Sequence, residues 1–551
     1  MRSLRAPRAA GKFFVDIVSP SHYDDDGYVI QWFRALVPVN SLGCVYALAK
    51  DVADRRALGE SVEVVVNAYD ERHTVIPVRR ITRRILANGG RGVVLLAGVQ
   101  TNQMPRAMDL AREFRRAGVQ VAVGGFHVSG CLAMLPELPE ELRELQAMGV
   151  ALFAGEAEGR MQALLEDACS QSLKPLYNHL GDLPDLVGHP TPTLPRSLCR
   201  KNLFFGAFDA GRGCPFDCSF CTIINVQGRR PRARSVEDVE RALREGLALG
   251  IRRFFISDDN FSRNPDWEPI LDRLIAIREQ EQARFKIFLQ VDALSHTIPG
   301  FIEKAARAGC NRVFIGLESL SPDDLASVKK RHNLVSEYGP MLQAWRLRGV
   351  TTFCPYLIGL PSDTPESIAR DVATIQRELP VDFLQPFILT PLPGSAYHKS
   401  LQAAGAWMEP DLNRYDLEHV TTEHPRMSGA EYWGAYQDAW HRYYSPEHIE
   451  TLIRRAKRDG LGTRHMADAI QGFYGSFRFE GLHPYQVGIF RRRVRTTRRP
   501  GLPVERRVAF HLRETRRALQ KYTAFALFSL QLQRIRRRVE RESFPSPEPA
   551  H

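Results

Sequence analysis

The chain alternates short apolar runs with segments of helical periodicity, and this alternation occurs in two separate series. The first series occupies residues 12–170, where the apolar runs are rich in β-branched residues. Its predicted strands are Phe13–Val18, Val62–Ala68, Val93–Gly98, Val119–Gly124 and Ala151–Ala154, and its predicted helices are Val75–Leu86, Pro105–Ala117, Glu140–Met148 and Glu156–Cys169. Strands that are separated by helices run parallel, so the sequence predicts a doubly wound α/β sheet.

The second series contains six strand–helix repeats. Its predicted strands are Leu203–Asp209, Arg253–Ser257, Lys286–Val291, Arg312–Gly316, Thr352–Ile358 and Phe383–Thr390, and its predicted helices are Val236–Leu249, Trp267–Gln280, Pro299–Ala308, Pro322–Lys330 and Glu366–Glu378. Six such repeats predict a (βα)6 partial barrel or an open sheet. In both arrangements the functional site lies at the C-terminal ends of the strands.

The segments around the two series differ in composition. Residues 172–202 are rich in Pro and Leu and lack periodicity, which indicates an interdomain linker. Beyond residue 395 the chain becomes helical and aromatic, and then basic. The predicted organisation is a sheet domain at 12–171, the linker at 172–202, a barrel domain at 203–395, a helical aromatic-rich extension at 396–490 and a basic helical tail at 491–551.

Three of the nine cysteines are clustered, whereas the other six are scattered singly, as small buried residues usually are in a reducing compartment. Cys214, Cys218 and Cys221 follow the first strand of the second series with C-x3-C-x2-C spacing. One loop with this spacing can hold three corners of a [4Fe-4S] cluster and leave one iron open to a ligand. Structural zinc usually draws on a second pair of ligands, and no second C-x2-C pair occurs in the sequence. Purely structural thiols remain the other alternative.

The cysteine motif, with Phe220 before its last cysteine, resembles the motif of the radical S-adenosylmethionine superfamily. The later strand ends also fit this family, because they carry Ser257-Asp258-Asp259-Asn260, Gln290-Val291-Asp292, Gly316-Leu317-Glu318-Ser319, Gly359-Leu360-Pro361 and Leu389-Thr390-Pro391-Leu392-Pro393-Gly394. The resemblance covers about residues 203–395. It implies a partial TIM barrel and a cluster on Cys214, Cys218 and Cys221 whose open iron binds S-adenosylmethionine. The resulting 5′-deoxyadenosyl radical would abstract hydrogen from an unactivated carbon.

The same resemblance implies which residues contact S-adenosylmethionine. Phe220 would lie near the adenine with Gly359 and Leu360, and Gln290, Glu318 and Ser319 would lie near the ribose or the methionine polar groups. Ser257 and Asp259 belong to the same predicted site. From the residues alone, Glu318 is also compatible with a solvated strand-end carboxylate, and Asp258 and Asp259 with helix capping.

Glycine-rich loops follow the third, fourth and fifth strands of the first series, where a doubly wound sheet binds its ligands. The motifs Gly124-Gly125-Phe126-His127 and Gly155-Glu156-Ala157-Glu158, placed before such a barrel, resemble the cobalamin-binding subfamily with its flavodoxin-like, Rossmann-type domain. The resemblance implies a cobalamin site formed by Gly98, Thr101, Gly124, Gly125, His127, Gly155 and Glu156. The glycines alone are also compatible with simple turns of the chain.

The D-x-H-x-x-G signature, whose His binds cobalt in many cobalamin proteins, is absent. The loop after the first strand contains His22, but out of register, so the lower axial ligand stays open. Asp24, Asp25 and Asp26 in this loop are predicted to cap a helix over residues 28–36 rather than to bind a metal.

Residues 222–235 resemble the segment after the cluster loop in the branch that contains the bacterial hopanoid methylases. The segment carries four arginines, Arg229, Arg230, Arg232 and Arg234. Guanidinium groups beside an active site suit an anionic ligand or the cofactor carboxylate. A solvated surface loop is the alternative interpretation.

The positive charge of the chain belongs to its tail. The formal net charge is +12, and residues 491–551 account for all of it, with 16 arginines and one lysine against five glutamates. The apolar stretch Tyr522–Leu532 has basic flanks but is shorter than the ~20 residues that span a bilayer. It predicts a helix that docks on the barrel, lies at the inner face of the membrane, or binds RNA. Segregation of apolar from basic residues makes nucleic acid the weakest of the three.

The preferred hypothesis is a cytoplasmic radical enzyme, a cobalamin-dependent methyltransferase that acts on an unactivated carbon of a small or lipid-like substrate. It implies an electron donor such as a flavodoxin, a ferredoxin or a reductase. A second hypothesis is a radical cyclase or another enzyme that forms or rearranges carbon–carbon bonds without methylcobalamin. A third is a non-catalytic Fe–S protein that binds nucleic acid or a membrane, which the open cluster position argues against.

Overall fold

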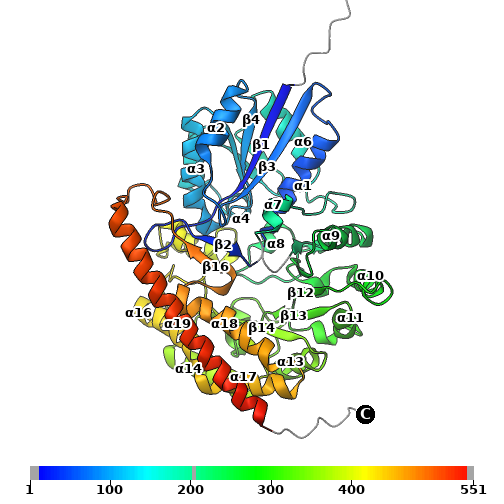
Figure 1. The fold of residues 1–551 in the computed structure, drawn as a ribbon, viewed down its shortest axis with the longest axis vertical. Coiled ribbons are helices and arrows are strands. Elements are labelled where there is room, and N and C mark those ends of the chain that lie inside the picture. Colours follow the sequence, from blue (N-terminus) through cyan, green and yellow to red (C-terminus); the bar gives the residue numbers. More distant parts are fainter. Residues whose placement is uncertain (1–10, 37, 202–205, 543–551) are drawn as a thin grey trace, which may run out of the picture.

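A six-stranded parallel sheet forms the N-terminal half of the computed structural model, which describes residues 11–36, 38–201 and 206–542 (Figure 1). Its strands are β1 (Gly11–Ser19), β3 (Val62–Asp70), β4 (Gly92–Leu96), β5 (Gln120–Gly124), β6 (Ala151–Ala154) and β7 (Leu176–Asn178). The order is β3-β1-β4-β5-β6-β7, and every neighbouring pair is parallel. The strand order reverses between β1 and β4, which is where such sheets bind ligands.

Helices cover both faces of this sheet. On one face, α1 (Asn40–Asp54) and α6 (Met161–Cys169) bury Leu48 and Leu164 against Leu95 and Phe153 of the strands. The other face is covered by α2 (Val78–Ala87), α3 (Met104–Arg116), α4 (Phe126–Met134) and α5 (Glu140–Ala147). Burial on both faces explains why the central strands are apolar throughout. The predicted doubly wound sheet is confirmed.

The second half carries another six-stranded parallel sheet, of order β15-β14-β13-β12-β11-β8. Its strands are β8 (Gly206–Phe208), β11 (Arg253–Ile256), β12 (Lys286–Val291), β13 (Cys310–Ile315), β14 (Thr351–Ile358) and β15 (Phe383–Ile388). Its connecting helices are α9 (Val236–Ala248), α10 (Trp267–Glu279), α11 (Phe301–Arg307), α12 (Pro322–Ser327), α13 (Tyr338–Leu347) and α14 (Pro365–Glu378). Among the described residues β8 does not pair with β15, so the predicted (βα)6 unit is an open one. Residues 203–205 of the first predicted strand lie outside the described residues.

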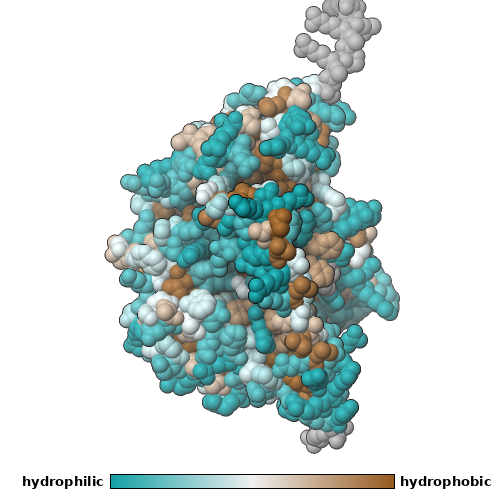
Figure 2. Space-filling view, turned by 60° about the vertical axis from the view of Figure 1, so that its left-hand side comes forward, coloured by the Kyte–Doolittle hydropathy of each residue, from teal (hydrophilic) through white to brown (hydrophobic). Residues whose placement is uncertain are grey.

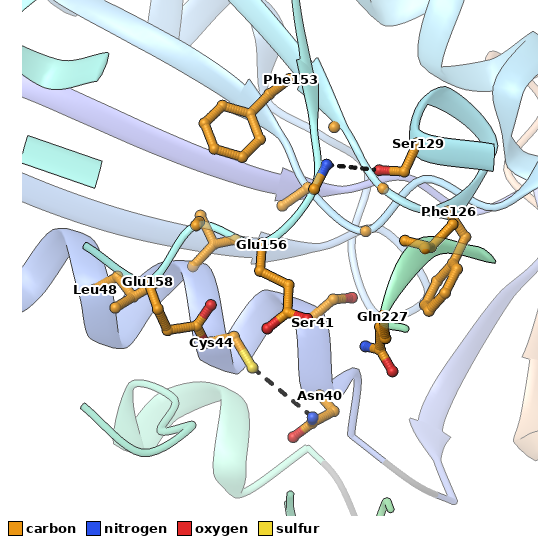
Figure 3. A pocket seen from close by; sticks show the side chains of 18 of the residues that line it. Asn40, Ser41, Cys44, Leu48, Phe126, Ser129, Phe153, Glu156, Glu158 and Gln227 are labelled. Carbon is orange, nitrogen blue, oxygen red and sulfur yellow. Dashed lines mark hydrogen bonds between the residues drawn. The ribbon is translucent and has the colours of Figure 1, made fainter. Parts of the chain in front are cut away.

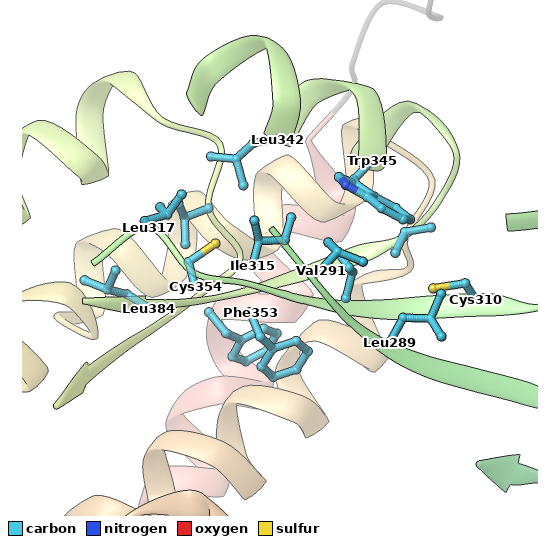
Figure 4. Close-up of a cluster of buried hydrophobic side chains, with 14 of the residues drawn as sticks. Leu289, Val291, Cys310, Ile315, Leu317, Leu342, Trp345, Phe353, Cys354 and Leu384 are labelled. Carbon is cyan, nitrogen blue, oxygen red and sulfur yellow. The ribbon is translucent and has the colours of Figure 1, made fainter. Parts of the chain in front are cut away.

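The largest core lies between this sheet and its helices (Figure 4). Leu289 and Val291 of β12 are buried in it together with Trp345 of α13. Because side chains alternate along a strand, the intervening Gln290 faces the opposite, inner side of the sheet. The helices of the core therefore orient the polar strand-end residues toward the inside of the barrel.

The C-terminal third packs further helices on the barrel: α15 (Ala396–Ala403), α16 (Gly429–Tyr443), α17 (Pro446–Arg458), α18 (Thr463–Glu480) and α19 (Arg507–Arg541). α19 lies along α17 and α18 (Figure 1). Its Phe528, Leu532, Ile535 and Val539 are buried in the same core cluster as the barrel strands. Of the alternatives for the apolar stretch 522–532, docking on the barrel is thus confirmed. None of the described helices is long and apolar enough to cross a membrane.

The helix predicted over residues 28–36 is wrong, because this segment forms the strand β2 (Gln31–Ala35). β2 pairs antiparallel with β16 (Gly488–Arg492), which comes from the other end of the chain. Asp24 therefore caps no helix. Its carboxylate accepts a hydrogen bond from the Tyr28 N–H at 2.8 Å and pairs with Arg491 and Arg493 of the tail at 2.7 and 2.8 Å.

Short elements complete the fold. They are η1 (Thr101–Gln103), α7 (Arg196–Cys199), β9 (Gly211–Arg212), α8 (Ile223–Val226), β10 (Arg232–Ala233), η2 (Phe261–Arg263), η3 (Ser295–Thr297), η4 (Val335–Glu337), η5 (Leu412–Arg414) and η6 (Pro484–Gln486). β7 and α7 lie within the segment 172–202, so the Pro-rich region predicted as a linker contributes an edge strand to the first sheet.

Candidate functional site

The three clustered cysteines lie on one loop between β9 and α8, beyond the C-terminal end of β8. Cys214, Cys218 and Cys221 are free and partly buried. The loop is anchored on the barrel, because the Ser219 N–H donates to the Val328 carbonyl at 3.0 Å. Burial raises the pKa of the Cys221 thiol to about 12. The protein alone therefore does not stabilise this thiolate, whereas coordination to a metal deprotonates a thiol outright. These residues fit the three protein corners of a [4Fe-4S] cluster.

A buried lysine that the sequence analysis missed joins several predicted residues beside this loop. The Lys330 Nζ lies 2.5 Å from Glu318 Oε1 and 5.9 Å from the centre of the Phe220 ring. Glu318 is only 6% exposed, which excludes a solvated carboxylate. Phe220 also packs in one apolar cluster with Leu360. The structure thus brings Phe220, Glu318 and Leu360 together next to the cysteine loop.

The backbone near Gly359 is held by a buried carboxylate. Asp363 accepts hydrogen bonds from the N–H groups of Gly359 and Leu360, both at 2.8 Å. Gly359 has φ +103°, and a Cβ there would lie 1.7 Å from the Tyr432 hydroxyl oxygen, so only glycine fits. Ser319 has a local role as well, since its Oγ accepts a bond from the Ser321 N–H at 3.0 Å.

Polar groups at the end of β11 hold the neighbouring strands together. Asp258 accepts a hydrogen bond from the Ala210 N–H at 2.7 Å, and Gln290 donates to the Asp258 carbonyl at 3.1 Å. Burial raises the pKa of both Asp258 and Asp259 to about 7. Helix capping does not account for Asp258, because its carboxylate bonds to the end of another strand. Ser257 and Asp259 instead line a cavity.

This cavity of about 400 Å³ lies between the two halves of the protein (Figure 3). On the sheet side it is lined by five of the residues predicted for cobalamin, Gly98, Gly124, Gly125, Gly155 and Glu156. Its inner end is apolar and lies between the sheet and the helices α1 and α6, at Leu48, Leu95, Phe153 and Leu164. On the barrel side it reaches Ser257, Asp259 and, just after the cysteine loop, Val226 and Gln227. The cavity therefore joins five of the residues predicted for cobalamin to two of the eight predicted for S-adenosylmethionine, Ser257 and Asp259. The other six and the three cysteines are not among the residues that line it.

At two of these glycines a Cβ would collide with a neighbouring residue. A Cβ on Gly98, at φ +69°, would lie 1.9 Å from the Ser41 Oγ. A Cβ on Gly125, at φ +145°, would lie 2.2 Å from the Val99 backbone nitrogen. Side chains at these positions would displace the loops that form the rim of the cavity.

The other two residues predicted for cobalamin, Thr101 and His127, are not among the residues that line the cavity. His127 is fully buried, and its Nδ1 lies 3.2 Å from the Thr101 Oγ1. Its Nε2 faces Glu141 Oε1 at 2.9 Å and the Cys131 Sγ at 3.8 Å. The structure thus brings Thr101 and His127 together with residues of α4 and α5.

A buried arginine links the two halves at the cavity wall. Arg212 of β9 pairs with Glu156 at 2.7 Å and Glu158 at 2.6 Å, and with Asp209 at 3.0 Å. Burial would raise the pKa of Glu158, but the Arg212 guanidinium lowers it below its ordinary value. Arg232 also pairs with Glu156, as Arg234 does with Asp209. Arg232 and Arg234, two of the four arginines that were predicted to suit an anionic ligand, are therefore already paired with carboxylates of the chain.

Sequence reasoning missed the helix α1, which supplies Asn40, Ser41 and Cys44 to the cavity. The signal was available, because Leu42, Val45 and Leu48 recur with helical spacing after Asn40. His22 lies elsewhere: it is buried at 8% exposure and is not among the cavity-lining residues.

The comparisons with known proteins agree with this geometry. The sequence profile described as the Radical SAM superfamily matches residues 210–375. The chain is 26% identical over 344 residues to bacteriochlorophyllide d C-8(2)-methyltransferase of Chlorobaculum tepidum, which covers 59% of this chain and 72% of that protein. It is 26% identical over 364 residues to hopanoid C-2 methylase of Rhodopseudomonas palustris, covering 65% of this chain and 64% of the relative.

Two solved structures share the fold. One is the radical S-adenosylmethionine methyltransferase TsrM from Kitasatospora setae with cobalamin and a [4Fe-4S] cluster bound, at a TM-score of 0.59 and 16% identity over 79% of this chain and 90% of that chain. The other is the cobalamin-dependent S-adenosylmethionine radical enzyme OxsB, at a TM-score of 0.54 and 14% identity over 96% and 80%. At these identities the likeness concerns the arrangement of sheet and barrel.

Proposed function

We propose that this chain, a radical S-adenosylmethionine enzyme by its domain at residues 210–375, is a cobalamin-dependent methyltransferase that acts on an unactivated carbon of a small or lipid-like substrate. The observation that carries the proposal is the cavity between the halves, because it joins the glycine-rich ends of the first sheet to the strand ends beside the cysteine loop. The two relatives named above are methylating enzymes by name, which supports methyl transfer.

The residues at the cysteine loop have distinct tasks in this proposal. Cys214, Cys218 and Cys221 would hold the cluster, and Phe220 with Leu360 would offer an apolar surface to the adenine. When bound, the cluster and cobalamin supply the electron that cleaves the sulfonium and the methyl group that is transferred. Lys330 fixes the Glu318 carboxylate, so that this group is pre-oriented for a polar part of S-adenosylmethionine.

The cavity also fits cobalamin chemically. Its inner end is apolar, and small residues, Ala97 and Ala122, lie on the central strands there and leave room for an aromatic group. Three buried polar atoms on cavity-lining residues have no hydrogen-bond partner among the described residues: Asn40 Oδ1, Gln227 Oε1 and Ser257 Oγ. Buried polar atoms are normally paired. Primary amides, which surround the corrin ring, would supply the missing donors.

Anaerobic reconstitution with iron, sulfide and cobalamin, followed by S-adenosylmethionine and a reductant, tests the proposal. We expect bound cobalamin and 5′-deoxyadenosine with the wild-type chain, and no 5′-deoxyadenosine with the Cys214/Cys218/Cys221→Ala variant. Cys169→Ser, a partly buried cysteine outside the loop, is the matched control and keeps the activity. Absence of 5′-deoxyadenosine from the wild type would refute radical chemistry. Its formation without bound cobalamin would refute methyl transfer by this route and favour another radical reaction.

We also propose that α19 contacts the inner membrane surface, which would suit a lipid-like substrate. Its side opposite the core carries exposed apolar residues, with Leu512 at 68%, Leu519 at 65% and Leu527 at 62% exposure. Arg507 and Arg516 lie beside this stripe and would attract anionic lipid. Figure 2 shows a mixed face, on which hydrophobic patches are separated by hydrophilic side chains.

Co-sedimentation with anionic vesicles tests the contact. We expect Leu512→Glu/Leu519→Glu to bind the vesicles at least tenfold more weakly than the wild type, because two apolar side chains no longer enter the lipid. Leu347→Glu on α13, where the leucine is 73% exposed, is the matched control and should bind like the wild type. Equal binding by all three proteins would refute the proposal.

A further inference from the structure

A buried set of metal-ligating side chains lies outside the cavity and the cysteine loop. His127 and Cys131 are one turn apart on the same face of α4, and Glu141 lies in the first turn of α5. One ligand atom from each of the three lies within 4.8 Å of the others. His127 and Cys131 are 0% and 2% exposed. Buried thiols and imidazoles in such proximity are the donor types that zinc prefers.

The separations are close to those of a metal site. With about 2.3 Å from zinc to sulfur and about 2.0–2.1 Å to nitrogen or oxygen, tetrahedral ligands lie roughly 3.3–3.6 Å apart. The His127 Nε2 is 2.9 Å from Glu141 Oε1 and 3.8 Å from the Cys131 Sγ. The two separations that involve His127 therefore differ from those of a tetrahedral site by a few tenths of an ångström, and the Cys131 Sγ and the Glu141 carboxylate lie within 4.8 Å of each other.

A second residue holds the His127 imidazole through its Nδ1, as is usual for metal-binding histidines. Its Nδ1 lies 3.2 Å from the Thr101 Oγ1, so the opposite nitrogen, Nε2, points toward the thiol and the carboxylate. Burial would lower the pKa of His127, but Cys131 and Glu141 raise it to about 10.

A further buried histidine, His398 of α15, lies on the barrel side. It is 7% exposed, and its Nδ1 has no hydrogen-bond partner among the described residues. His398 is not one of the three residues whose ligand atoms lie within 4.8 Å of one another, so it is not assigned as a ligand. The backbones of α4 and the segment before α15 touch, because a Cβ on Gly130 would lie 2.6 Å from the Pro393 carbonyl oxygen.

We propose that His127, Cys131 and Glu141 bind one zinc ion in the sheet domain, next to the barrel. α4 lies at the border between the two halves (Figure 1). Binding releases the thiol proton of Cys131 and the proton shared by His127 and Glu141. It forms three bonds from the protein to the metal and leaves the fourth position to water, with no change of oxidation state. The site is independent of the cluster and of the proposed methyl transfer.

Metal analysis of the full-length, cluster-loaded protein from zinc-supplemented cells tests this site. We expect about one zinc per chain, and zinc K-edge absorption that reports one sulfur among nitrogen and oxygen ligands. Cys131→Ser should lower zinc affinity at least 100-fold while the iron content stays unchanged, and Thr101→Val should lower the affinity about 10–100-fold by releasing the ring. Cys169→Ser is the matched control and keeps the zinc.

Two further proteins separate the site from its alternatives. The Cys214/Cys218/Cys221→Ala variant should keep its zinc, which distinguishes this site from zinc in an empty cluster loop. Glu141→Gln should lose one of the three ligands and bind zinc at least tenfold more weakly, with near-wild-type circular dichroism. A wild-type protein without zinc, or zinc retained equally by Cys131→Ser, would overturn the proposal. Neither result would affect the test for 5′-deoxyadenosine.

Discussion

Replacement of Arg212 by methionine is the sharpest test of how the two halves are joined. The side chain is 9% exposed and pairs with Glu156, Glu158 and Asp209. Methionine keeps much of the volume of the arginine side chain but leaves the buried carboxylates with less positive charge to balance them. Breaking a buried ion pair costs about 3–5 kcal/mol. Because Arg232 and Arg234 still face Glu156 and Asp209, we expect the lower end, about 3 kcal/mol.

The matched control is Arg55→Met. Arg55 pairs with Asp51 at 2.8 Å on the surface of α1 and its side chain is 54% exposed. Exposed pairs of this kind contribute about 0.3–0.5 kcal/mol. Urea unfolding followed by tryptophan fluorescence should therefore give a much lower midpoint for Arg212→Met and nearly the wild-type midpoint for Arg55→Met. Equal midpoints for the two variants would refute the reasoning.

The sign of the pH dependence gives a second check on the same variant. Arg212 lowers the pKa of Glu158 in the folded wild type, so this pair stabilises the protein above the unfolded pKa of about 4.3 and is lost as the pH falls. In Arg212→Met the buried carboxylate has a raised pKa and takes up a proton in mild acid. The stability difference between wild type and variant should therefore narrow from pH 7.5 to pH 5.5, and Glu158→Gln should partly rescue Arg212→Met. A stability difference that stays constant between pH 7.5 and pH 5.5 would contradict the role assigned to the Arg212–Glu158 ion pair.

Further substitutions test the rim of the cavity, the lysine and the tail. Gly98→Ala should lower the cobalamin content at least tenfold, because its Cβ would meet the Ser41 Oγ. The control is Gly118→Ala. Gly118 has a similar φ of +78°, but a Cβ there would have no atom within 4 Å, so the variant should cost only about 1 kcal/mol of backbone strain. Lys330→Met should weaken S-adenosylmethionine binding about tenfold in calorimetry of the cluster-loaded protein, because Glu318 loses its partner. The neighbouring Lys329 is exposed, so Lys329→Met should leave this binding unchanged. Phe528→Ala removes a ring that α19 buries in the core, so it should lower the free energy of unfolding by about 3–5 kcal/mol, measured as a lower thermal midpoint.

The alternation of strands and helices could be predicted because it is a local signal. Five strands of the first sheet and all six of the second were predicted from short apolar runs, and the cysteine motif was predicted to follow the first strand of the second series, which is β8. The helix predicted at residues 28–36 failed for a physical reason. Gln31–Ala35 becomes a strand through backbone hydrogen bonds to Gly488–Arg492, and no window around residue 31 contains that partner. Asp24 was misread for the same reason, since its partners are Arg491 and Arg493.

The candidate site was predictable where the motif lies on a strand end and less so where it lies on a helix. Gly98, Gly125 and Gly155 follow strands directly, and the sheet topology brings them to one edge. His127 is the second residue of α4, so its direction depends on how that helix is rotated in the core. Lys330 could not be identified as a site residue, because only the fold brings it to Glu318 and Phe220.

The cavity requires that the two halves keep a fixed relation, because each half supplies part of its wall. Domains in one chain usually move relative to each other unless their interface is extensive. Here separate ties cross the border: Arg212 with Glu156 and Glu158, the pairing of β2 with β16, and two 2.9 Å hydrogen bonds between Tyr23 and Asn413. β16 leads into the segment that holds the excess positive charge, and Arg491 at its end and Arg493 just after it pair with Asp24 beside the first sheet. Part of the positive charge of the tail therefore forms ion pairs within the protein, although this charge first suggested an external partner. The exposed apolar stripe of α19 is the part of the tail that faces outward.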